Sequence, residues 1–283
     1  MTSRRKTSAL AASALLAALL APPASALELL VPAYFYPTTH ASEWQSLNTV
    51  AAHQPLSVVV NPDGGAGTAF DPNYAAAIDA LRTAGGKAYG YIGTDWGTRD
   101  ASAVQAEIDR YLDWYALDGL FVDEVSEYAA DLDYYHALRS YVTAAAPALG
   151  LIGNPGTPTV EGYLDIFDTL VIYEDSAAKL SSFTAPAYQS QYDASRFGML
   201  VHGADEATMQ TLVNGAAAAN IGYLYTTDTA FGSRLWQELP SYWDAQTVAA
   251  AALTAPVPEP PAALMMLAGT ATLLAAARRR ARA

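Results

Sequence analysis

The chain has 283 residues, no cysteine and a formal net charge of −13. Without cysteine, neither disulfides nor thiolate metal sites can contribute, so stability must come from packing. Between two terminal segments with the character of sorting signals lie about 225 residues, enough for one domain with a single large core. This central part has eight basic and 27 acidic residues, a net charge of −19. Such acidity disfavours nucleic acid and anionic lipid as partners and suits a cationic ligand, although the solubility of a secreted protein explains it as well.

Residues 1–26 have the order of a secretory signal peptide. A basic stretch at 4–6 precedes an Ala/Leu run at 9–20, and Ala24-Ser25-Ala26 forms a small-residue cleavage site. The residues after Arg4-Arg5 fit a twin-arginine signal poorly. We therefore expect export through the inner membrane and removal of this segment.

Residues 253–283 have the order of a second signal. Pro258-Glu259-Pro260 is followed by an apolar run at 261–277 and by an arginine cluster at 278–282. The run is only marginally long enough for a transmembrane helix, so one interpretation is a weak tail anchor. The order resembles the PEP-CTERM sorting signal, which implies an exosortase as processing partner. It also implies delivery to the outer surface or extracellular matrix of a Gram-negative bacterium, with membrane contact only through this segment.

The central part alternates Ala-rich segments with short apolar runs. Apolar residues at three- and four-residue spacing predict helices at 74–86, 102–117, 131–147 and 205–220. Runs rich in Val, Ile, Leu, Phe and Tyr predict eight strands, at 27–36, 56–62, 87–94, 119–124, 149–155, 169–175, 196–203 and 221–228.

Eight nearly continuous apolar strands alternating with helices predict a parallel sheet. The natural solution is an α/β fold of the (β/α)8 TIM barrel type, forming a single domain over 27–252. An open doubly wound sheet is the alternative, but no dinucleotide glycine fingerprint follows the first strand. The crossover at 176–195 is the weakest part of the prediction because its sequence makes at best a short helix. The Gly-rich segment 61–72 lacks the features of a phosphate loop, and we expect a mobile surface loop over a site.

Polar residues gather at the C-terminal ends of the predicted strands, where TIM barrels hold their active sites. Asp123 and Glu124 end the fourth strand and Glu174 ends the sixth. Glycoside hydrolysis needs two carboxyl groups flanking the scissile bond. Because one strand separates the fourth from the sixth, at roughly 4.8 Å per step, Asp123 and Glu174 are close enough to meet across a sugar. The ordinary alternatives are a helix N-cap for Asp123 and a surface acid for Glu174.

Other side chains expected at this level are amides for sugar hydroxyls and flat rings for sugar faces. The candidates for substrate binding are Tyr34, Tyr36, Asn61, Tyr91, Asn154, Tyr173, His202 and Asp228. For His202, an ordinary loop histidine is an equally good interpretation. The four histidines lack metal-ligand spacing, so neither a metal nor another cofactor is predicted.

The motifs "LLVPAYFYP", "VVVNP", "GYIGT", "DGLFVDE", "GNPG" and "VIYE" occur in an order that resembles the spherulin 4 family of secreted glycoside hydrolases, over most of residues 29–236. The resemblance implies a (β/α)8 barrel and metal-free endo-hydrolysis of α-1,4-linked galactosamine or N-acetylgalactosamine (GalNAc) polymers of biofilm matrix. Its acidic pair falls on Asp123 and Glu124, and its later acid on Glu174. Asp123 would then be the nucleophile of a retaining reaction, Glu174 the general acid/base, and Glu124 a neighbour that orients substrate or tunes the pair.

Two other functions fit the same sequence. A non-catalytic surface or matrix protein would bind polysaccharide without releasing reducing ends, although paired carboxylates at strand ends argue for chemistry. A hydrolase of an unrelated polysaccharide would share the mechanism and differ only in specificity.

Overall fold

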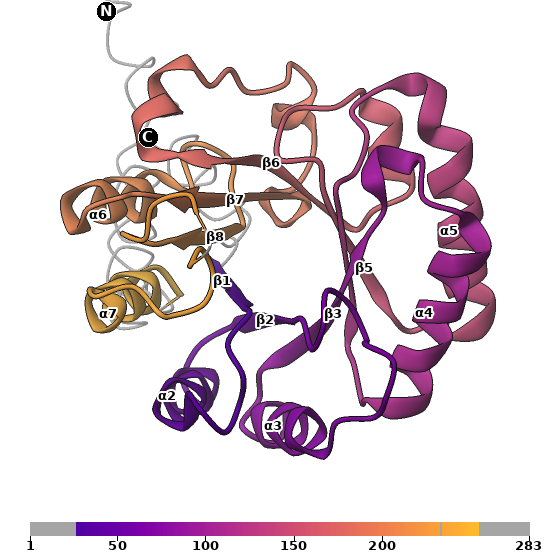
Figure 1. Ribbon diagram of the computed structural model, residues 1–283. Helices are drawn as coiled ribbons and strands as arrows, with labels where there is room; N and C mark the ends of the chain where they lie inside the picture. The colour runs from indigo at the N-terminus through magenta and orange to yellow at the C-terminus, as the bar shows by residue number, and fades with distance from the viewer. Residues whose placement is uncertain (1–26, 233, 255–283) are drawn as a thin grey trace, which may run out of the picture. The chain divides into compact units, whose positions relative to one another are not determined.

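The computed structural model describes residues 27–232 and 234–254, and there all eight predicted strands form one closed parallel barrel in sequence order (Figure 1). The barrel closes because β1 pairs with β8 as well as with β2. This is the predicted (β/α)8 TIM barrel. The strands are β1 Glu28–Ala33, β2 Leu56–Val60, β3 Lys87–Gly93, β4 Gly119–Asp123, β5 Gly150–Asn154, β6 Thr169–Ser176, β7 Phe197–His202 and β8 Tyr223–Thr226.

Six α-helices occur in the described part of the chain, and they surround the barrel (Figure 1). Three of them, α3, α4 and α6, begin after an aspartate whose carboxylate accepts a backbone N–H of the first turn, a strong start signal. The helices are α2 Ala41–Ala51, α3 Pro72–Thr83, α4 Ala101–Trp114, α5 Leu132–Ala145, α6 Glu206–Gly215 and α7 Trp243–Thr254.

Two crossovers lack an α-helix. The segment after β6 forms only the 3-10 turns η4 Ala177–Ser182, η5 Gln189–Gln191 and η6 Ala194–Arg196, which confirms that this crossover is weakly helical. The crossover from β5 to β6 has only η3 Glu161–Asp165. The loops above β6 therefore have no long helix to fix them and depend on side-chain contacts.

The expected signal peptide at 1–26 lies outside the described residues, and so does the expected sorting segment at 253–283 except for its first two residues, which end α7. Within the residues described, no helix combines the length and the apolar character needed to cross a bilayer.

Both faces of the strands are buried, as a barrel covered by helices requires. Every residue of β1, β2 and β7 is buried. At the N-terminal end of the barrel, Glu28 accepts hydrogen bonds from Ser57 (2.5 Å) and from the ammonium of Lys87 (3.0 Å). Polar contacts thus join β1, β2 and β3 at this end of the barrel.

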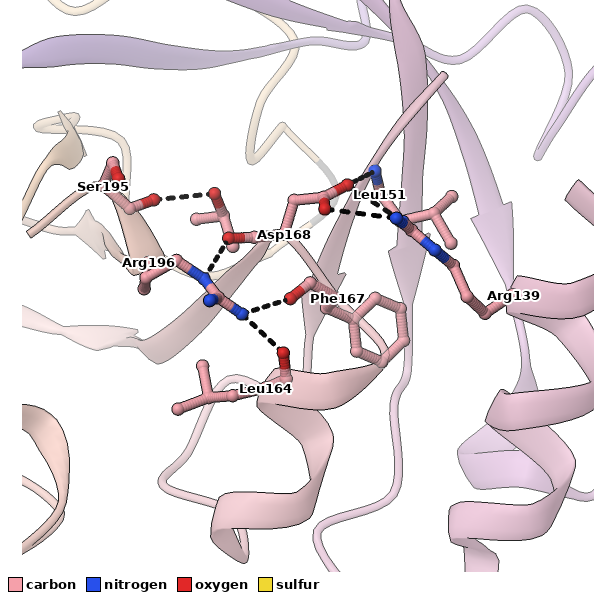
Figure 2. A network of polar contacts seen from close by, with 8 residues as sticks. Arg139, Leu151, Leu164, Phe167, Asp168, Ser195 and Arg196 are labelled. Carbon is pink, nitrogen blue, oxygen red and sulfur yellow. Dashed lines mark hydrogen bonds and ion pairs between the residues drawn. The ribbon is translucent and has the colours of Figure 1, made fainter. Parts of the chain in front are cut away.

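Asp168, directly before β6, joins a helix to the neighbouring strand (Figure 2). Its carboxylate accepts two hydrogen bonds from Arg139 of α5, at 2.9 and 3.3 Å, and one from the backbone N–H of Leu151 at 2.8 Å. Asp118, directly before β4, repeats the arrangement with Arg82 of α3 at 3.0 and 3.1 Å. At two places, therefore, an aspartate directly before a strand links an arginine of a helix to the barrel.

Arg196 supports the crossover between β5 and β6 (Figure 2). Its guanidinium donates to the carbonyl oxygens of Leu164 (2.5 Å), Phe167 (2.8 Å) and Asp168 (2.6 Å). These carbonyls lie at the end of the short turn η3 and just after it, where no continuing helix supplies N–H donors. One side chain from the next crossover therefore satisfies three backbone acceptors.

Arg196→Lys should lower the free energy of unfolding by about 1–3 kcal/mol, because a single ammonium cannot reach three carbonyls that the planar guanidinium spans. Urea unfolding followed by circular dichroism measures the change. The matched control is Arg234→Lys, whose exposed ion pair with Glu238 (2.5 Å) should contribute less than about 0.5 kcal/mol. Equal effects of the two substitutions would show that the network contributes no more than a surface ion pair.

Candidate active site

Asn154, the last residue of β5, lies between two carboxylates from the neighbouring strands. Its Nδ2 donates to Oδ1 of Asp123 at 2.7 Å and also to Oε2 of Glu174. Because one nitrogen reaches both acids, the two facing oxygens are no more than roughly 5.5 Å apart, which is two hydrogen bonds end to end. The Asn154 amide is itself held, since its Oδ1 accepts the backbone N–H of Gly156 at 3.1 Å. The ends of β4, β5 and β6 thus build one preformed carboxylate pair.

Each carboxylate has a further donor. The hydroxyl of Tyr91, in β3, hydrogen-bonds to Asp123. The indole Nε1 of Trp236, in the loop after β8, donates to Oε1 of Glu174 at 3.3 Å. Tyr34 stands edge-on to Tyr91, with ring centroids 5.6 Å apart. Side chains from opposite sides of the barrel therefore fix the orientation of both acids.

The two carboxyl groups differ in how strongly their surroundings favour the charged form. Burial, and then the charge of Asp123, raise the pKa of Glu174 to about 7, against the opposing hydrogen bonds from Asn154 and Trp236. Burial also raises the pKa of Asp123, but that carboxylate accepts hydrogen bonds from the Glu124 N–H, Tyr91 and Asn154. Because two close carboxylates share their protons, Asp123, which accepts more hydrogen bonds, ionises first and Glu174 keeps its proton near neutral pH.

Glu124 positions the rim of the site. Its Oε2 accepts the backbone N–H of Asp95 at 3.1 Å, and its carbonyl accepts that of Trp96 at 2.8 Å. All three residues have left-handed backbone angles, with φ of 53°, 48° and 51°. Such conformations cost about 1–3 kcal/mol each and persist where surrounding contacts enforce them. Glu124 therefore connects the carboxylate pair to a strained turn that presents Trp96.

These residues open into a cavity of about 740 Å³ at the C-terminal end of the barrel, within the range of small-molecule sites. Asp123, Glu124, Asn154 and Glu174 line it, with Trp96, His202, Phe231 and Lys179 among the others. Burial lowers the pKa of His202, so its ring is neutral near pH 7. The Nδ1 atom of His202 is buried and has no hydrogen-bond partner among the described residues.

The model of spherulation-specific family 4 (Spherulin4) matches residues 28–250. The chain belongs to this family. Spherulin-4 of Physarum polycephalum is 30% identical over 238 residues, 80% of this chain and 71% of that protein. The solved structure of Sph3 from Aspergillus clavatus in complex with GalNAc has a TM-score of 0.70 at 21% identity. It covers 80% of this chain and 98% of that one, a likeness that shows the shared barrel fold.

In this family member, four of the predicted binding residues lie away from the pocket. Tyr36 donates to Asp71 at 3.0 Å, at the start of α3. Asp228 accepts from the backbone N–H of Ser241 at 3.2 Å and lines a separate surface hollow. Tyr173 packs edge-on against Phe183 with ring centroids 5.2 Å apart. The hydroxyl of Tyr173 donates to the carbonyl of Ser176 at 2.7 Å, and Tyr173 is not among the residues that line the catalytic pocket.

The fourth of these residues, Asn61, belongs to the Gly-rich segment, whose backbone is hydrogen-bonded to two side chains. Asn61 Oδ1 accepts the backbone N–H of Gly65 at 2.7 Å. Buried Glu107 of α4 accepts the N–H of Ala66 at 3.0 Å and pairs with Arg99 at 2.5 Å. The turn needs glycine at 65, since φ is 138° and a Cβ there would lie 1.5 Å from the Glu107 carboxylate. None of residues 61–72 lines the catalytic pocket, so the structure does not place this loop over the site.

Trp236 is the site residue that the sequence did not reveal. It lies in the loop after β8, has φ of 64°, and is buried with its indole N–H on Glu174. Its only sequence signal is a large aromatic residue in a loop at the C-terminal side of a barrel strand. Among residues 27–232 and 234–254, no group of three or more acidic or histidine side chains is arranged to hold a metal ion.

Proposed function

We propose that the protein is a retaining glycoside hydrolase that cleaves an exopolysaccharide containing α-1,4-linked galactosamine or GalNAc. The observation that carries this proposal is the pair Asp123 and Glu174, joined by one amide nitrogen of Asn154. Retaining glycosidases hold their two carboxyl groups about 5–5.5 Å apart, and inverting enzymes hold them about 6.5–9.5 Å apart. The short bridge through Asn154 supports the retaining geometry.

In the proposed reaction, ionised Asp123 attacks the anomeric carbon while protonated Glu174 gives its proton to the glycosidic oxygen. The bond between the anomeric carbon and the glycosidic oxygen breaks, and the anomeric carbon forms an ester with Asp123. Glu174, now a carboxylate, then takes a proton from water, whose oxygen displaces Asp123 from the anomeric carbon. The pKa of about 7 at Glu174 suits both roles near neutral pH.

Family membership and the GalNAc bound to Sph3 support an amino-sugar polymer as substrate. The net charge of −19 over the central part supports a polymer that carries some free amines. We further propose that the protein acts outside the cell, on the bacterial surface or in the surrounding matrix, after an exosortase has processed the C-terminal segment.

The test is a reducing-end assay of residues 27–254 on galactosaminogalactan, on N-acetylated and deacetylated galactosamine oligomers, and on chitosan. We expect release from the α-1,4-galactosamine substrates and none from chitosan, whose linkage differs. Binding without release on every polymer would overturn the hydrolase proposal and favour a polysaccharide-binding protein. Release from chitosan alone would point to an unrelated polysaccharide as substrate.

A further inference from the structure

A second cavity, of about 320 Å³, adjoins the catalytic pocket and has no part in the reaction described so far. It shares Trp96 and Pro155 with that pocket and extends over the segment that follows β4. Its other lining includes Ser126, Glu127, Tyr128 and Asp131. The two cavities therefore adjoin each other at Trp96 and Pro155.

The wall of the second cavity is held in place before any ligand binds. Ser126 donates its hydroxyl to Asp131 at 2.5 Å, and its backbone N–H donates to Tyr135 at 2.9 Å. The carbonyl of Tyr128 accepts the hydroxyl of Tyr163 at 2.9 Å. Because Ser126, Tyr128 and Asp131 of the β4–α5 loop are held in this way, binding here would require little ordering of the loop.

Two aromatic rings are exposed in this wall. Trp96 is 58% exposed and Tyr128 is 65% exposed. Within the described part of the chain, neither ring packs against another aromatic ring. The contacts of Glu124 that hold the strained turn 95–97 keep Trp96 at the boundary of the two cavities. An exposed ring on a fixed turn next to a catalytic pocket offers a flat apolar surface of the kind that stacks on a sugar face.

The charges differ between the two sides of the carboxylate pair. The second cavity contains the acids Glu127 and Asp131 and no basic residue. The opposite side of the catalytic pocket contains Lys179, paired with Asp175 at 2.8 Å, and the neutral His202. A sugar with a free ammonium group is therefore better matched to the second cavity than to the far side of the pocket.

From these observations we propose that the cavity between Trp96 and Tyr128 is a further sugar-binding subsite, which holds a unit of the polymer beyond the cleavage point and favours a unit with a free amine. The proposal rests on the hydrolase function proposed above. In this proposal the substrate is an extended sugar chain that passes over Trp96, and Tyr128 and Glu127 bind one of its units.

The experiment measures kcat/KM for α-1,4-galactosamine oligomers of increasing length, each prepared in N-acetylated and free-amine forms. In the wild type, kcat/KM should rise when the chain becomes long enough to reach the subsite. Trp96→Ala and Tyr128→Ala should each reduce that gain about tenfold, the scale of one aromatic anchor, and leave the shortest substrates less affected. Glu127→Gln should reduce the preference for the free-amine form roughly fivefold.

The matched control is Phe70→Ala. Phe70 is also an exposed aromatic, at 50%, but it stacks on Tyr115 with ring centroids 6.0 Å apart and does not line either cavity. Tyr128→Ala separates binding from catalysis because Tyr128 lines only the second cavity, whereas Trp96 lines both cavities. A wild-type length gain in both variants would overturn the subsite and leave the hydrolase intact. A wild type that cleaves no oligomer of any length would overturn the proposed function and the subsite with it.

Discussion

Glu174→Gln should lower kcat on an α-1,4-galactosamine polymer by about a thousandfold, because the glutamine amide cannot donate the proton that the leaving oxygen needs. The substitution keeps the shape of the side chain and an oxygen that still accepts from Asn154 or Trp236. The loss should therefore appear in turnover and not in the fold. Reducing-end release with purified variant and wild type measures it.

The pH dependence of the wild type follows from the same residue. Burial and the charge of Asp123 raise the pKa of Glu174 to about 7, so the proton donor is lost and kcat/KM falls as the pH rises above about 7. On the acid side, activity falls where Asp123 takes up a proton, at a pH above the ordinary range of an aspartate because burial raises its pKa. A profile that stays flat up to pH 9 would exclude Glu174 as the general acid.

The raised pKa of Glu174 also predicts that the wild-type protein becomes less stable when this carboxyl group ionises. The folded protein binds the Glu174 proton more tightly than the unfolded chain, so this contribution is complete below about pH 4.5 and is lost as the pH rises through about 7. Glutamine does not ionise. Between pH 4.5 and pH 8, the free energy of unfolding of Glu174→Gln should therefore improve relative to wild type by as much as about 3 kcal/mol.

The control for the loss of activity is Asp228→Asn, which removes another carboxylate near the end of a strand. Because Asp228 contacts Ser241 and lies outside the catalytic pocket, this variant should keep its turnover. Equal losses of activity in the two variants would show that the assay reports on folding and not on Glu174.

Asp123→Asn should lower kcat at least about ten-thousandfold, because an amide oxygen is too weak a nucleophile to form the glycosyl ester. It should also lower the pKa of Glu174, since the charge of Asp123 is one of the causes of its rise. A titration of the Glu174 carboxyl followed by carbon NMR measures this second effect in a variant that has no turnover. A variant whose fold is merely altered would not show this decrease in the pKa of Glu174.

The matched variant is Glu124→Gln, at the other acid of the adjacent pair. Its side-chain oxygen can still accept the N–H of Asp95, so the turn that carries Trp96 should persist and activity should fall much less. NMR of the first product formed by the wild type should show the α anomer, as a retaining reaction requires. If Glu124→Gln lost turnover and Asp123→Asn kept its activity, the nucleophile would be Glu124 and not Asp123.

Much of the fold could be predicted because its signals are local. Eight apolar runs bounded by polar residues predicted the barrel, and the observed strand ends differ from the predicted ones by at most a few residues. Helices α3, α4, α5 and α6 begin close to their predicted positions because capping aspartates and apolar spacing are local signals. The absence of a regular helix at 176–195 was also visible, since that segment lacks helical periodicity.

The sequence alone determined the barrel and which strands carry carboxylates at their C-terminal ends, because strand period and strand order fix those positions. Only the tertiary structure decided which of the polar residues meet. It placed Asn154 between Asp123 and Glu174, turned Tyr173 away from the pocket, and brought Trp236 from the last loop onto Glu174. These outcomes depend on side-chain direction at strand ends and on left-handed loop residues. Both are set by contacts between segments far apart in the chain, and local sequence does not encode them.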